Sequence, residues 1–207
     1  MNEQFELFIH LFSRDRRVRH FVDNMKQALQ RAAKRSFAKK GYKATSISDI
    51  CRDAHVAVGS FYNCYPSKEA IFLEIYAEEN NRIRAEMVNE IDWSADPTEV
   101  IPAIFDYTFK CMSANRILSE WNSPAIGKRL REHYRAGDGK EDFFLHFLLA
   151  TFESWMHDAG FDEEKSRKVL RVCELVIYVD THVTEKDFPG VGQALETLAA
   201  YFVKGLF

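Results

Sequence analysis

One short segment carries the side chains best suited to chemistry in this sequence. Ser60 and Asn63 stand three residues apart, so in a helix they share one face. Ala57, Val58 and Gly59 come just before them and are small enough to let the start of that helix approach a partner closely. Hydroxyl and amide groups placed in this way suit the edges of DNA bases in the major groove. The alternative is a corner of the core that binds nothing.

Two further places in the same region suit phosphate groups. Thr45 and Ser46 stand just before an expected helix, and Ser46-Ile47-Ser48-Asp49 has the spacing of a capping box. Lys68 stands at the start of a later helix. Because helix N-termini and ammonium groups both bind phosphate, Thr45 and Lys68 predict contacts that position a nucleic acid without reading its sequence. The alternative is a helix cap and a solvated lysine.

The motifs of common enzymes and metal sites do not occur. Gly127-Lys128 and Gly139-Lys140 are followed by Arg and Glu, where a phosphate-binding loop needs Ser or Thr, and neither G-x-S-x-G nor H-E-x-x-H is present. His146 and Glu153 are seven residues apart, without the closer ligand pair that a metal site needs. We therefore expect no catalytic residues, no metal and no cofactor. The alternative is an all-helical enzyme that uses the aromatic residues of the second half.

The composition of the 207 residues is that of an ordinary globular protein, with 46% hydrophobic and 29% charged residues. Only 9 Gly and 5 Pro occur, which favours helices and excludes collagenous and mostly disordered chains. The 4 Cys form no C-x-x-C pair, so we expect reduced thiols and a cytoplasmic protein. The apolar stretch from Phe5 to Phe12 is broken by polar residues, and we expect neither a signal peptide nor a membrane span.

Charge is distributed unevenly along the chain. Residues 1–70 hold 13 Lys and Arg against 7 Asp and Glu, whereas residues 71–207 hold 15 against 24, which together give the net charge of -3. A basic first part on an acidic body favours contact between the first part and a polyanion. The alternative is a solvated, lysine-rich helix face.

The first half of the chain has the pattern of a helix-turn-helix. Apolar residues recur every three or four positions from Phe21 to Phe37, which predicts an amphipathic helix, and Lys39-Lys40-Gly41 suits its C-terminal end. Three more helices are expected after it, over residues 47–54, 58–64 and 67–91. The two short helices, joined by a turn of three or four residues, make the helix-turn-helix.

The sequence pattern of the second half predicts helices and no strands. Asp96-Pro97-Thr98-Glu99 has an N-cap, a proline at the first helical position and an acid in the first turn. The expected spans are 97–117, 119–135, 138–159, 163–182 and 191–205. Breaks are expected at Asn122-Ser123-Pro124, Gly137-Asp138-Gly139, Gly160 and Phe188-Pro189-Gly190. No alternating strand pattern occurs, so the fold class is all-α.

Three motifs of the first half occur together at a definite spacing. They are G-Y-x-A-T-S-I-x-D-I from Gly41 to Ile50, G-x-F-Y from Gly59 to Tyr62, and S-K-E-x-I-F from Ser67 to Phe72. The stretch from about Met25 to Phe72 resembles the DNA-binding domain of the tetracycline-repressor (TetR) family of bacterial transcriptional regulators. The resemblance implies an N-terminal three-helix DNA-binding domain and a C-terminal helical domain for effector binding and dimerisation.

The DNA contacts that the resemblance implies fall on both short helices and on the helix that follows. The implied residues are Thr45, Ser46, Ala57, Val58, Gly59, Ser60, Tyr62, Asn63 and Lys68. Two features depart from the family pattern. His55 stands where the family usually has Gly, so the turn needs a left-handed His. The recognition helix has no Arg or Gln, so sequence preference must depend on Ser60, Asn63, van der Waals contacts and DNA shape.

The resemblance also implies a small-molecule pocket in the C-terminal helices and a homodimer through the last two helices. An apolar stripe from Val191 to Leu206 and the apolar segment 169–179 are compatible with such an interface, although a helix buried within one chain has the same pattern. Aromatic residues and isolated polar ones predict a mostly apolar or aromatic effector. The candidate effector residues are Phe105, Phe109, Met112, Trp121, Phe147, Trp155, Glu174 and Tyr178.

We therefore expect three segments: an N-terminal extension over residues 1–20, a helix-turn-helix domain over 21–68, and an effector-binding and dimerisation domain over 69–207. The extension is expected to be an extra helix, with a basic DNA-contacting arm as the alternative. The predicted function is a ligand-responsive transcriptional regulator, more specifically a repressor that binds a palindromic DNA operator as a dimer. A DNA-binding dimer without an effector is the second alternative.

Overall fold

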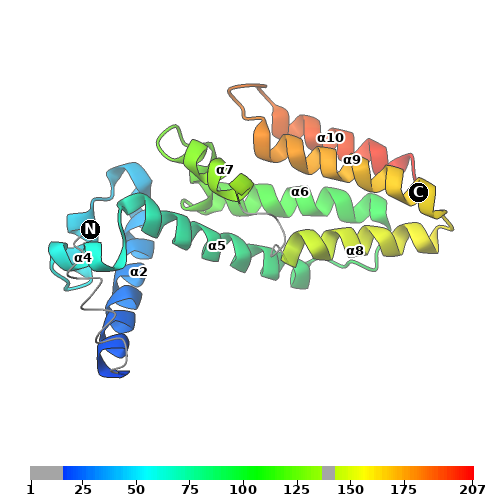
Figure 1. Ribbon diagram of the computed structural model, residues 1–207. Helices are drawn as coiled ribbons and strands as arrows, with labels where there is room; N and C mark the ends of the chain where they lie inside the picture. The colour runs from blue at the N-terminus through cyan, green and yellow to red at the C-terminus, as the bar shows by residue number, and fades with distance from the viewer. Residues whose placement is uncertain (1–15, 137–142) are drawn as a thin grey trace. The chain divides into compact units, whose positions relative to one another are not determined.

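The computed structural model describes residues 16–136 and 143–207, which form an all-α protein (Figure 1). The chain divides into two compact units, with the boundary between Ile75 and Tyr76. Most of the predicted N-terminal extension, residues 1–15, lies outside the described residues, as do residues 137–142. None of the helices in the described ranges combines the length and the apolar composition that a membrane crossing requires.

The first unit has the predicted helix-turn-helix. It consists of α2 (Arg16–Ala44), α3 (Ile47–Asp53), α4 (Val58–Cys64) and the first part of α5 (Lys68–Glu90). Each of the last three helices begins and ends within one residue of its predicted span. The first helix begins before Phe21, and its backbone is interrupted at Gly41, where φ is 78°. A positive φ suits a glycine at the C-terminal end of a helix, which was the predicted role of this residue.

A small apolar core joins these four helices. Phe37 of α2 meets Phe72 of α5 edge to face, with ring centroids 4.8 Å apart. Phe61 is the buried residue of α4, and it packs beside Tyr65. The fully buried apolar side chains of the unit are Leu29, Ala32, Ala33, Phe37, Ile50, Phe61, Ile71, Phe72 and Ile75. This core fixes the orientation of α4, because Phe61 anchors one of its faces.

The turn between α3 and α4 contains a left-handed histidine, as predicted. His55 has φ 55° and is the one non-glycine residue with positive φ among the described residues. Its backbone N–H donates to the carbonyl of Arg52 at 3.3 Å, and the N–H of Val56 donates to the carbonyl of Cys51 at 2.9 Å. These hydrogen bonds hold the turn in a conformation that is costly for a residue with a Cβ atom.

Replacing His55 by Gly is expected to stabilise the protein. The left-handed conformation costs an L-residue roughly 1–2 kcal/mol. Glycine avoids this cost, but its greater freedom in the unfolded chain lowers the free energy of unfolding by about 0.4–1 kcal/mol. We expect a gain of about 0.5–1 kcal/mol in the free energy of unfolding, measured by chemical denaturation. His55→Ala keeps the Cβ atom and should show no gain. Equal stabilities of the glycine and alanine variants would contradict the prediction.

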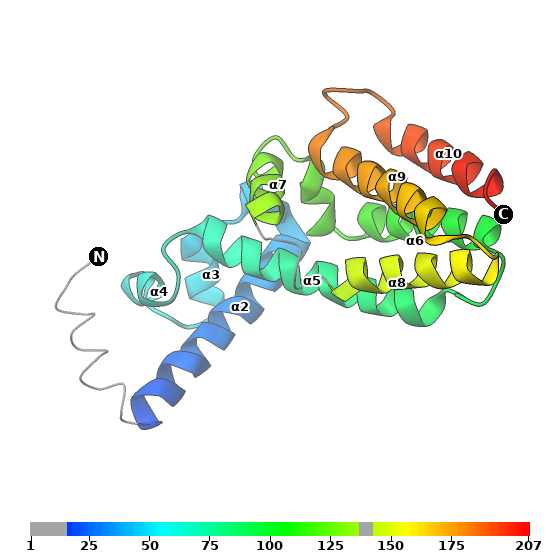
Figure 2. The same cartoon turned by 45° about the vertical axis from the view of Figure 1, so that its right-hand side comes forward.

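The second unit is a set of packed helices. After the rest of α5 come α6 (Pro97–Ala114), the 3-10 helix η1 (Leu118–Asn122), α7 (Gly127–Ala136), α8 (Phe143–Asp158), α9 (Glu163–His182) and α10 (Val191–Lys204). α10 packs on α6 and α9, and α8 packs on α9 (Figure 2). A core cluster joins α6, α8, α9 and α10, and its members are Ile101, Phe152, Met156, Val169 and Val203.

The start of α6 is confirmed and the single helix over 119–135 is wrong. Asp96 caps α6 by accepting a hydrogen bond from the backbone N–H of Thr98 at 2.8 Å. Residues 119–135 divide into η1 and α7 because Pro124 lacks an N–H group and disfavours the helical conformation of Ser123 before it. The predicted break at this place is therefore present, whereas the continuous span is not.

Gly127, the first residue of α7, lies against η1. A Cβ atom at this position would stand 2.3 Å from the carbonyl oxygen of Trp121. Because backbone would have to move, we expect Gly127→Ala to lower the free energy of unfolding by about 2 kcal/mol, within the range for overpacking. Gly192→Ala in α10 is the matched control, since nothing lies within 4 Å of that Cβ, and it should be neutral or slightly stabilising. Equal melting temperatures for the two variants would contradict the prediction.

Candidate nucleic-acid interface

Of the predicted pair on the short helix α4, Asn63 is exposed, whereas Ser60 is half-buried. Phe61 is fully buried, whereas Val58 is 44% exposed and Tyr62, four residues later, is 52% exposed. Gly59 and Asn63 form a second exposed pair with the same spacing. These four residues are exposed, although Val58 precedes Phe61 by three residues and so lies next to it on the helix surface. The other two predicted residues of this segment are placed beside them, Ala57 as the exposed N-cap and Ser60 as a half-buried residue.

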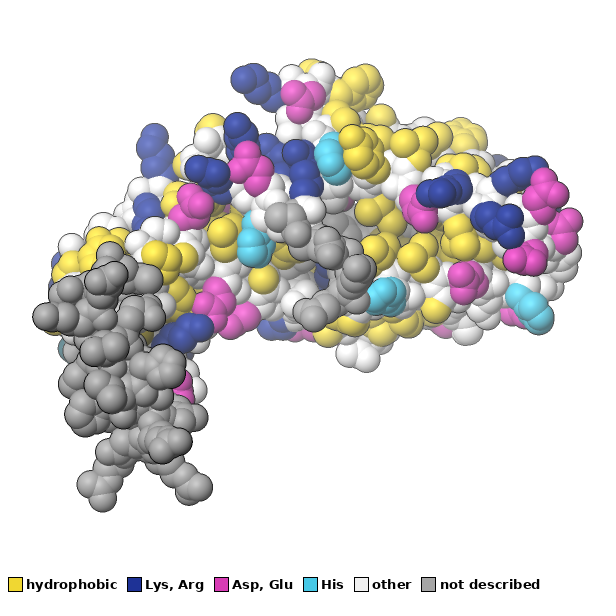
Figure 3. All heavy atoms as spheres, in the orientation of Figure 1, with side chains coloured by type: hydrophobic (Ala, Val, Ile, Leu, Met, Phe, Trp, Pro, Cys, Tyr) yellow, Lys and Arg dark blue, Asp and Glu magenta, His cyan; other side chains and the backbone are white. Residues whose placement is uncertain are grey.

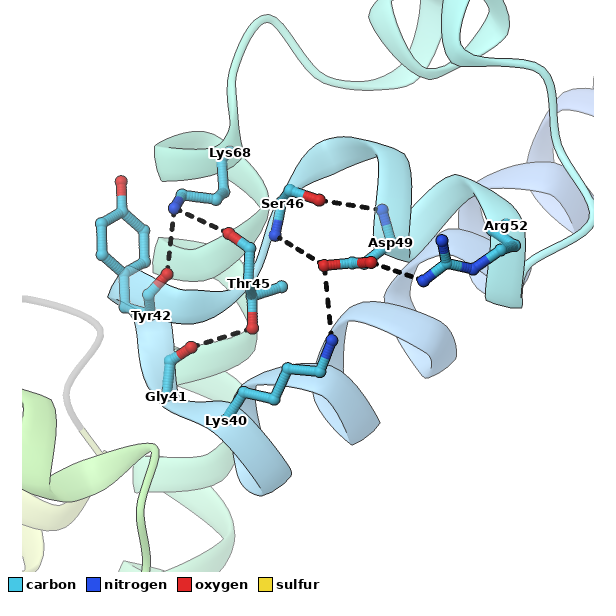
Figure 4. Close-up of polar contacts among 8 residues, drawn as sticks. All are labelled: Lys40, Gly41, Tyr42, Thr45, Ser46, Asp49, Arg52 and Lys68. Carbon is cyan, nitrogen blue, oxygen red and sulfur yellow. Dashed lines mark hydrogen bonds and ion pairs between the residues drawn. The ribbon is translucent and has the colours of Figure 1, made fainter.

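The start of α3 has the predicted capping box. Ser46 Oγ accepts from the backbone N–H of Asp49 at 3.1 Å, and Asp49 Oδ2 accepts from the backbone N–H of Ser46 at 3.4 Å (Figure 4). The same carboxylate contacts Arg52 at 2.5 Å and Lys40 at 3.4 Å. The hydrogen bond from Ser46 is the main cause that lowers the pKa of Asp49 to about 2, and the bonds to Arg52 and Lys40 add to it.

This carboxylate makes the stability of the first unit dependent on pH. The pKa of Asp49 in the folded protein, about 2, lies below its ordinary value of 3.8, so its contribution is complete above pH 4 and is lost as the pH falls toward 2. We expect Asp49→Asn to show a smaller fall in the free energy of unfolding over this range, measured by denaturation at successive pH values. Identical pH profiles for the two proteins would contradict the prediction.

Thr45 and Lys68 both have partners inside the unit. Thr45 is 2% exposed, and its hydroxyl donates to the carbonyl of Gly41 at 2.8 Å. The ammonium of Lys68 donates to the carbonyls of Tyr42 at 2.9 Å and Thr45 at 2.8 Å, and it stands 4.2 Å from the centroid of the Tyr42 ring (Figure 4). These contacts tie the end of α2 and the start of α3 to the first turn of α5. A phosphate contact by Thr45, Ser46 or Lys68 remains a prediction.

Two functional features escaped the sequence reasoning. The sequence predicts only a phosphate contact for Lys68, and no spacing rule connects it with the carbonyls of Tyr42 and Thr45, which lie more than twenty residues earlier in the chain. Arg52 was not considered, although its position three residues after Asp49 predicts the ion pair that the structure contains. The first contact depends on the tertiary fold, whereas the second could have been found from the sequence.

The predicted effector residues lie in several separate environments of the second unit. Trp121 packs with Tyr76 and Tyr134, at centroid distances of 6.2 and 5.7 Å. Phe147 meets Trp93 edge to face at 4.7 Å. The others lie against the core cluster (Phe105 and Trp155), are half-buried (Met112), or are exposed (Phe109, Glu174 and Tyr178). The structure does not place all eight residues around one site.

A buried carboxylate lies in the same unit and was not predicted. Glu79 is 4% exposed, and its Oε1 accepts from Arg82 at 2.6 Å and from the side-chain amide of Asn115 at 2.8 Å. It follows Tyr76 by three residues and so lies on the apolar face of α5. Helical spacing could have revealed this buried position, because Met87 continues the same face. Among the described residues, no group of His, Cys, Asp and Glu side chains is arranged to hold a metal ion.

Apolar side chains are exposed on α9 and α10. Leu175 and Tyr178 of α9 are 56% and 57% exposed, and Leu198 and Tyr201 of α10 are 51% and 72% exposed. Hydrophobic side chains gather over this edge of the second unit (Figure 3). An open depression of about 660 Å³ lies along α10, and its lining residues are Pro189, Gly190, Gln193, Ala194, Thr197, Leu198 and Tyr201. We call the four exposed apolar residues the α9–α10 patch.

The first unit is a helix-turn-helix domain of the type that binds DNA. Residues 29–75 match the family model described as bacterial regulatory proteins, tetR family. The match covers the helix-turn-helix unit, so this part of the chain is similar to the regulators of that family. A Bacillus subtilis (strain 168) protein, the uncharacterized HTH-type transcriptional regulator YuxN, is 44% identical over 39 residues. That match covers 19% of this chain and only 13% of the relative.

The fold of most of the chain is similar to that of two solved structures. FadR of Thermus thermophilus, a TetR family transcriptional repressor solved with lauroyl-CoA, gives a TM-score of 0.51 at 19% identity, covering 88% of this chain and 95% of that one. RolR, solved with resorcinol, gives a TM-score of 0.56 at 14% identity, covering 89% of this chain and 95% of that one. At such identities, the similarity establishes the fold.

Proposed function

We propose that this protein is a ligand-responsive repressor that binds a palindromic DNA operator as a homodimer. The observation that carries the proposal is the exposure of Val58, Gly59, Tyr62 and Asn63 on α4, a helix that the buried Phe61 anchors to the core. A helix anchored by one face and bare on the other is what entry into the major groove requires. The match of residues 29–75 to a family of DNA-binding regulators supports this role.

Exposed cations of the first unit supply the attraction to phosphate. Lys39, Lys40 and Lys43 are exposed near the end of α2, and Arg52 is exposed in the last turn of α3. Phosphate contacts of this kind position a protein on DNA and make its affinity depend on salt. The predicted contacts of Ser46 and Lys68 belong to the same set, with the internal hydrogen bonds of Lys68 limiting what that ammonium contributes.

The α9–α10 patch is proposed as the dimer interface. Four large apolar side chains are exposed on two helices that pack on each other, and two of them, Leu198 and Tyr201, line one depression. A two-fold dimer would bury this surface against its own copy. Dimerisation is needed for the proposed function, because a palindromic operator presents two half-sites about 34–36 Å apart.

The effector is proposed to be a mostly apolar or aromatic small molecule bound in the second unit. Among the predicted effector residues, Trp121 has the surroundings that fit best, since the rings of Tyr76 and Tyr134 lie beside it and Asn80 donates to the hydroxyl of Tyr134 at 3.2 Å. Fold neighbours solved with lauroyl-CoA and with resorcinol support a ligand of this chemistry. The remaining predicted effector residues stay candidates.

The proposed response depends on α5, which runs from Lys68 in the first unit to Glu90 in the second. Residues of this helix contact both the helix-turn-helix core, through Phe72, and the aromatic group around Trp121, through Tyr76. An effector that binds two tilts of α5 with unequal affinity shifts the population between a DNA-binding and a released state. The coupling free energy for such a shift is typically roughly 1–3 kcal/mol.

The test begins with the purified full chain. Sedimentation should give twice the mass of the chain, and selection from a random duplex library should enrich a palindrome whose affinity falls steeply with salt. A thermal-shift screen of lipophilic and aromatic compounds should then find a ligand that releases this duplex. Binding to all duplexes with equal affinity would contradict a specific regulator, and a stabilising ligand that leaves the complex intact would contradict the effector response.

The second candidate is a DNA-binding dimer without an effector. It is favoured by the aromatic packing of the second unit, where Trp121, Phe147 and Trp155 each meet rings of the same chain. In that case the rings stabilise the fold and leave no room for a ligand. The thermal-shift screen separates the two candidates, since this one predicts that no compound of the tested classes raises the melting temperature.

A further inference from the structure

The exposed face of the recognition helix carries no charge. α4 has the sequence Val-Gly-Ser-Phe-Tyr-Asn-Cys, and neither an acidic nor a basic residue occurs in it. Arg and Lys are the residues that most often recognise guanine, through its O6 and N7 atoms, and Glu or Asp accepts from cytosine. Asn pairs with the N6 and N7 atoms of adenine, and apolar side chains contact the methyl group of thymine. The chemistry of α4 is therefore that of A·T recognition.

The geometry of Val58 fits a methyl group. Val58 is the first residue of α4 and is 44% exposed, although its side chain is fully apolar. At Gly59, nothing lies within 4 Å of the place where a Cβ atom would stand, so a base edge can come close beside Val58. Tyr62, four residues after Val58, adds a second exposed apolar surface along the same side of the helix.

The polar partner on this face is Asn63. It is exposed and follows Gly59 by four residues, so its amide projects from the same open side of α4. The nearest exposed cation of α3 is Arg52, whose guanidinium is bound to Asp49 at 2.5 Å. Arg52 belongs to the exposed cations proposed above to contact phosphate, which leaves the amide of Asn63 and the side chain of Val58 as the base-reading groups of α4.

We propose that α4 reads A·T pairs, with Val58 contacting the 5-methyl group of thymine and Asn63 pairing with the edge of adenine. This inference rests on the proposed DNA-binding function and names the half-site that the function requires. The contacted positions of each operator half-site are A·T pairs. Val58 is the residue that distinguishes thymine from uracil. Burial of one methyl group corresponds to about fourfold in affinity.

The test uses the duplex that the full chain selects from a random library. Its half-sites should have A·T pairs at the fixed positions, and replacing the fixed thymines by deoxyuridine should weaken binding about fourfold for each contacted methyl group. Deoxyuridine at thymines outside the half-sites is the control and should leave the dissociation constant unchanged. Half-sites fixed on G·C pairs, or equal affinity for the thymine and uracil duplexes, would overturn the inference.

Variants of the protein test whether Val58 is the residue that distinguishes thymine from uracil. Val58→Ser has no methyl group and should bind the thymine and uracil duplexes equally, whereas Val58→Thr retains a methyl group and should keep most of the preference. Lys43→Ala, which changes an exposed cation, should weaken binding to both duplexes by the same factor. If Val58→Ser keeps the full preference for thymine, the assignment is overturned. If no duplex is enriched by the wild-type chain, the proposed DNA-binding function fails, an outcome distinct from the selection of G·C half-sites.

Discussion

Replacing Tyr201 by Glu is expected to convert the protein from a dimer into a monomer. Tyr201 is 72% exposed on α10 and lines the depression there, beside Leu198. In the proposed dimer this ring is buried, and a carboxylate in its place would lose its water without gaining a partner. We expect association to weaken about 100-fold or more, which is the effect of changing a central interface residue. Sedimentation at several protein concentrations measures the change.

A matched control tests whether the loss of the dimer requires a substitution in the α9–α10 patch or follows from a charge at any exposed aromatic residue. Phe109 of α6 is 77% exposed and lies outside the α9–α10 patch, so Phe109→Glu should leave the dimer intact. DNA affinity should fall with the loss of the dimer, because one recognition helix then contacts one half-site. Leu198→Glu should behave as Tyr201→Glu does. An unchanged mass for both α10 variants would contradict the proposed interface, as would dissociation of the Phe109 variant.

Local signals predicted most of the first unit. The capping box at Ser46 and Asp49 determined where α3 begins, and the helix-turn-helix followed from two short helices with a tight turn. The left-handed conformation of His55 could be expected because the family pattern places Gly there, and the structure confirms it. These features depend on neighbours within four residues, which is the range over which sequence spacing fixes geometry.

The second unit was harder to predict in detail. The helix starting at Pro97 had a clear cap. The break at Pro124 was also expected, but the span 119–135 was drawn across it, and the structure divides that span into η1 and α7. The predicted effector residues shared aromatic or isolated polar character, and nothing in their spacing showed which helices would bring them together. Trp121 pairs with Tyr76, which lies 45 residues earlier, and such pairs depend on the tertiary fold.

The exposure of Asn63 on α4 could be predicted because it depends on one helix alone, whereas the half-buried position of Ser60 was not predicted. Val58 and Tyr62 are exposed as well, although both are close to the buried Phe61 along the helix. The prediction for Lys68 was incomplete, because its contacts depend on several helices. Its ammonium meets carbonyls of α2 and of the segment before α3, and only the packing of three helices creates that contact.

Lys68→Met is expected to destabilise the first unit by about 2–3 kcal/mol, the range for charge-assisted hydrogen bonds whose partners are left without a donor. The variant keeps a long apolar side chain but removes the ammonium from the carbonyls of Tyr42 and Thr45 and from the face of the Tyr42 ring. These contacts join the end of α2 to the start of α5, so their loss should loosen the support of α3. Chemical denaturation followed by circular dichroism measures the change.

Lys43→Ala provides the comparison, because Lys43 is an exposed cation in the same segment. We expect this variant to keep the stability of the wild type and to lower the dependence of DNA affinity on salt by about one counterion. Lys68→Met should lose stability whether or not DNA is present. If the salt dependence of DNA affinity also falls by about one counterion in Lys68→Met, the ammonium of Lys68 binds a phosphate in addition to the two carbonyls. Wild-type stability of Lys68→Met would show that the carbonyl contacts contribute little, because water then satisfies both oxygens equally well.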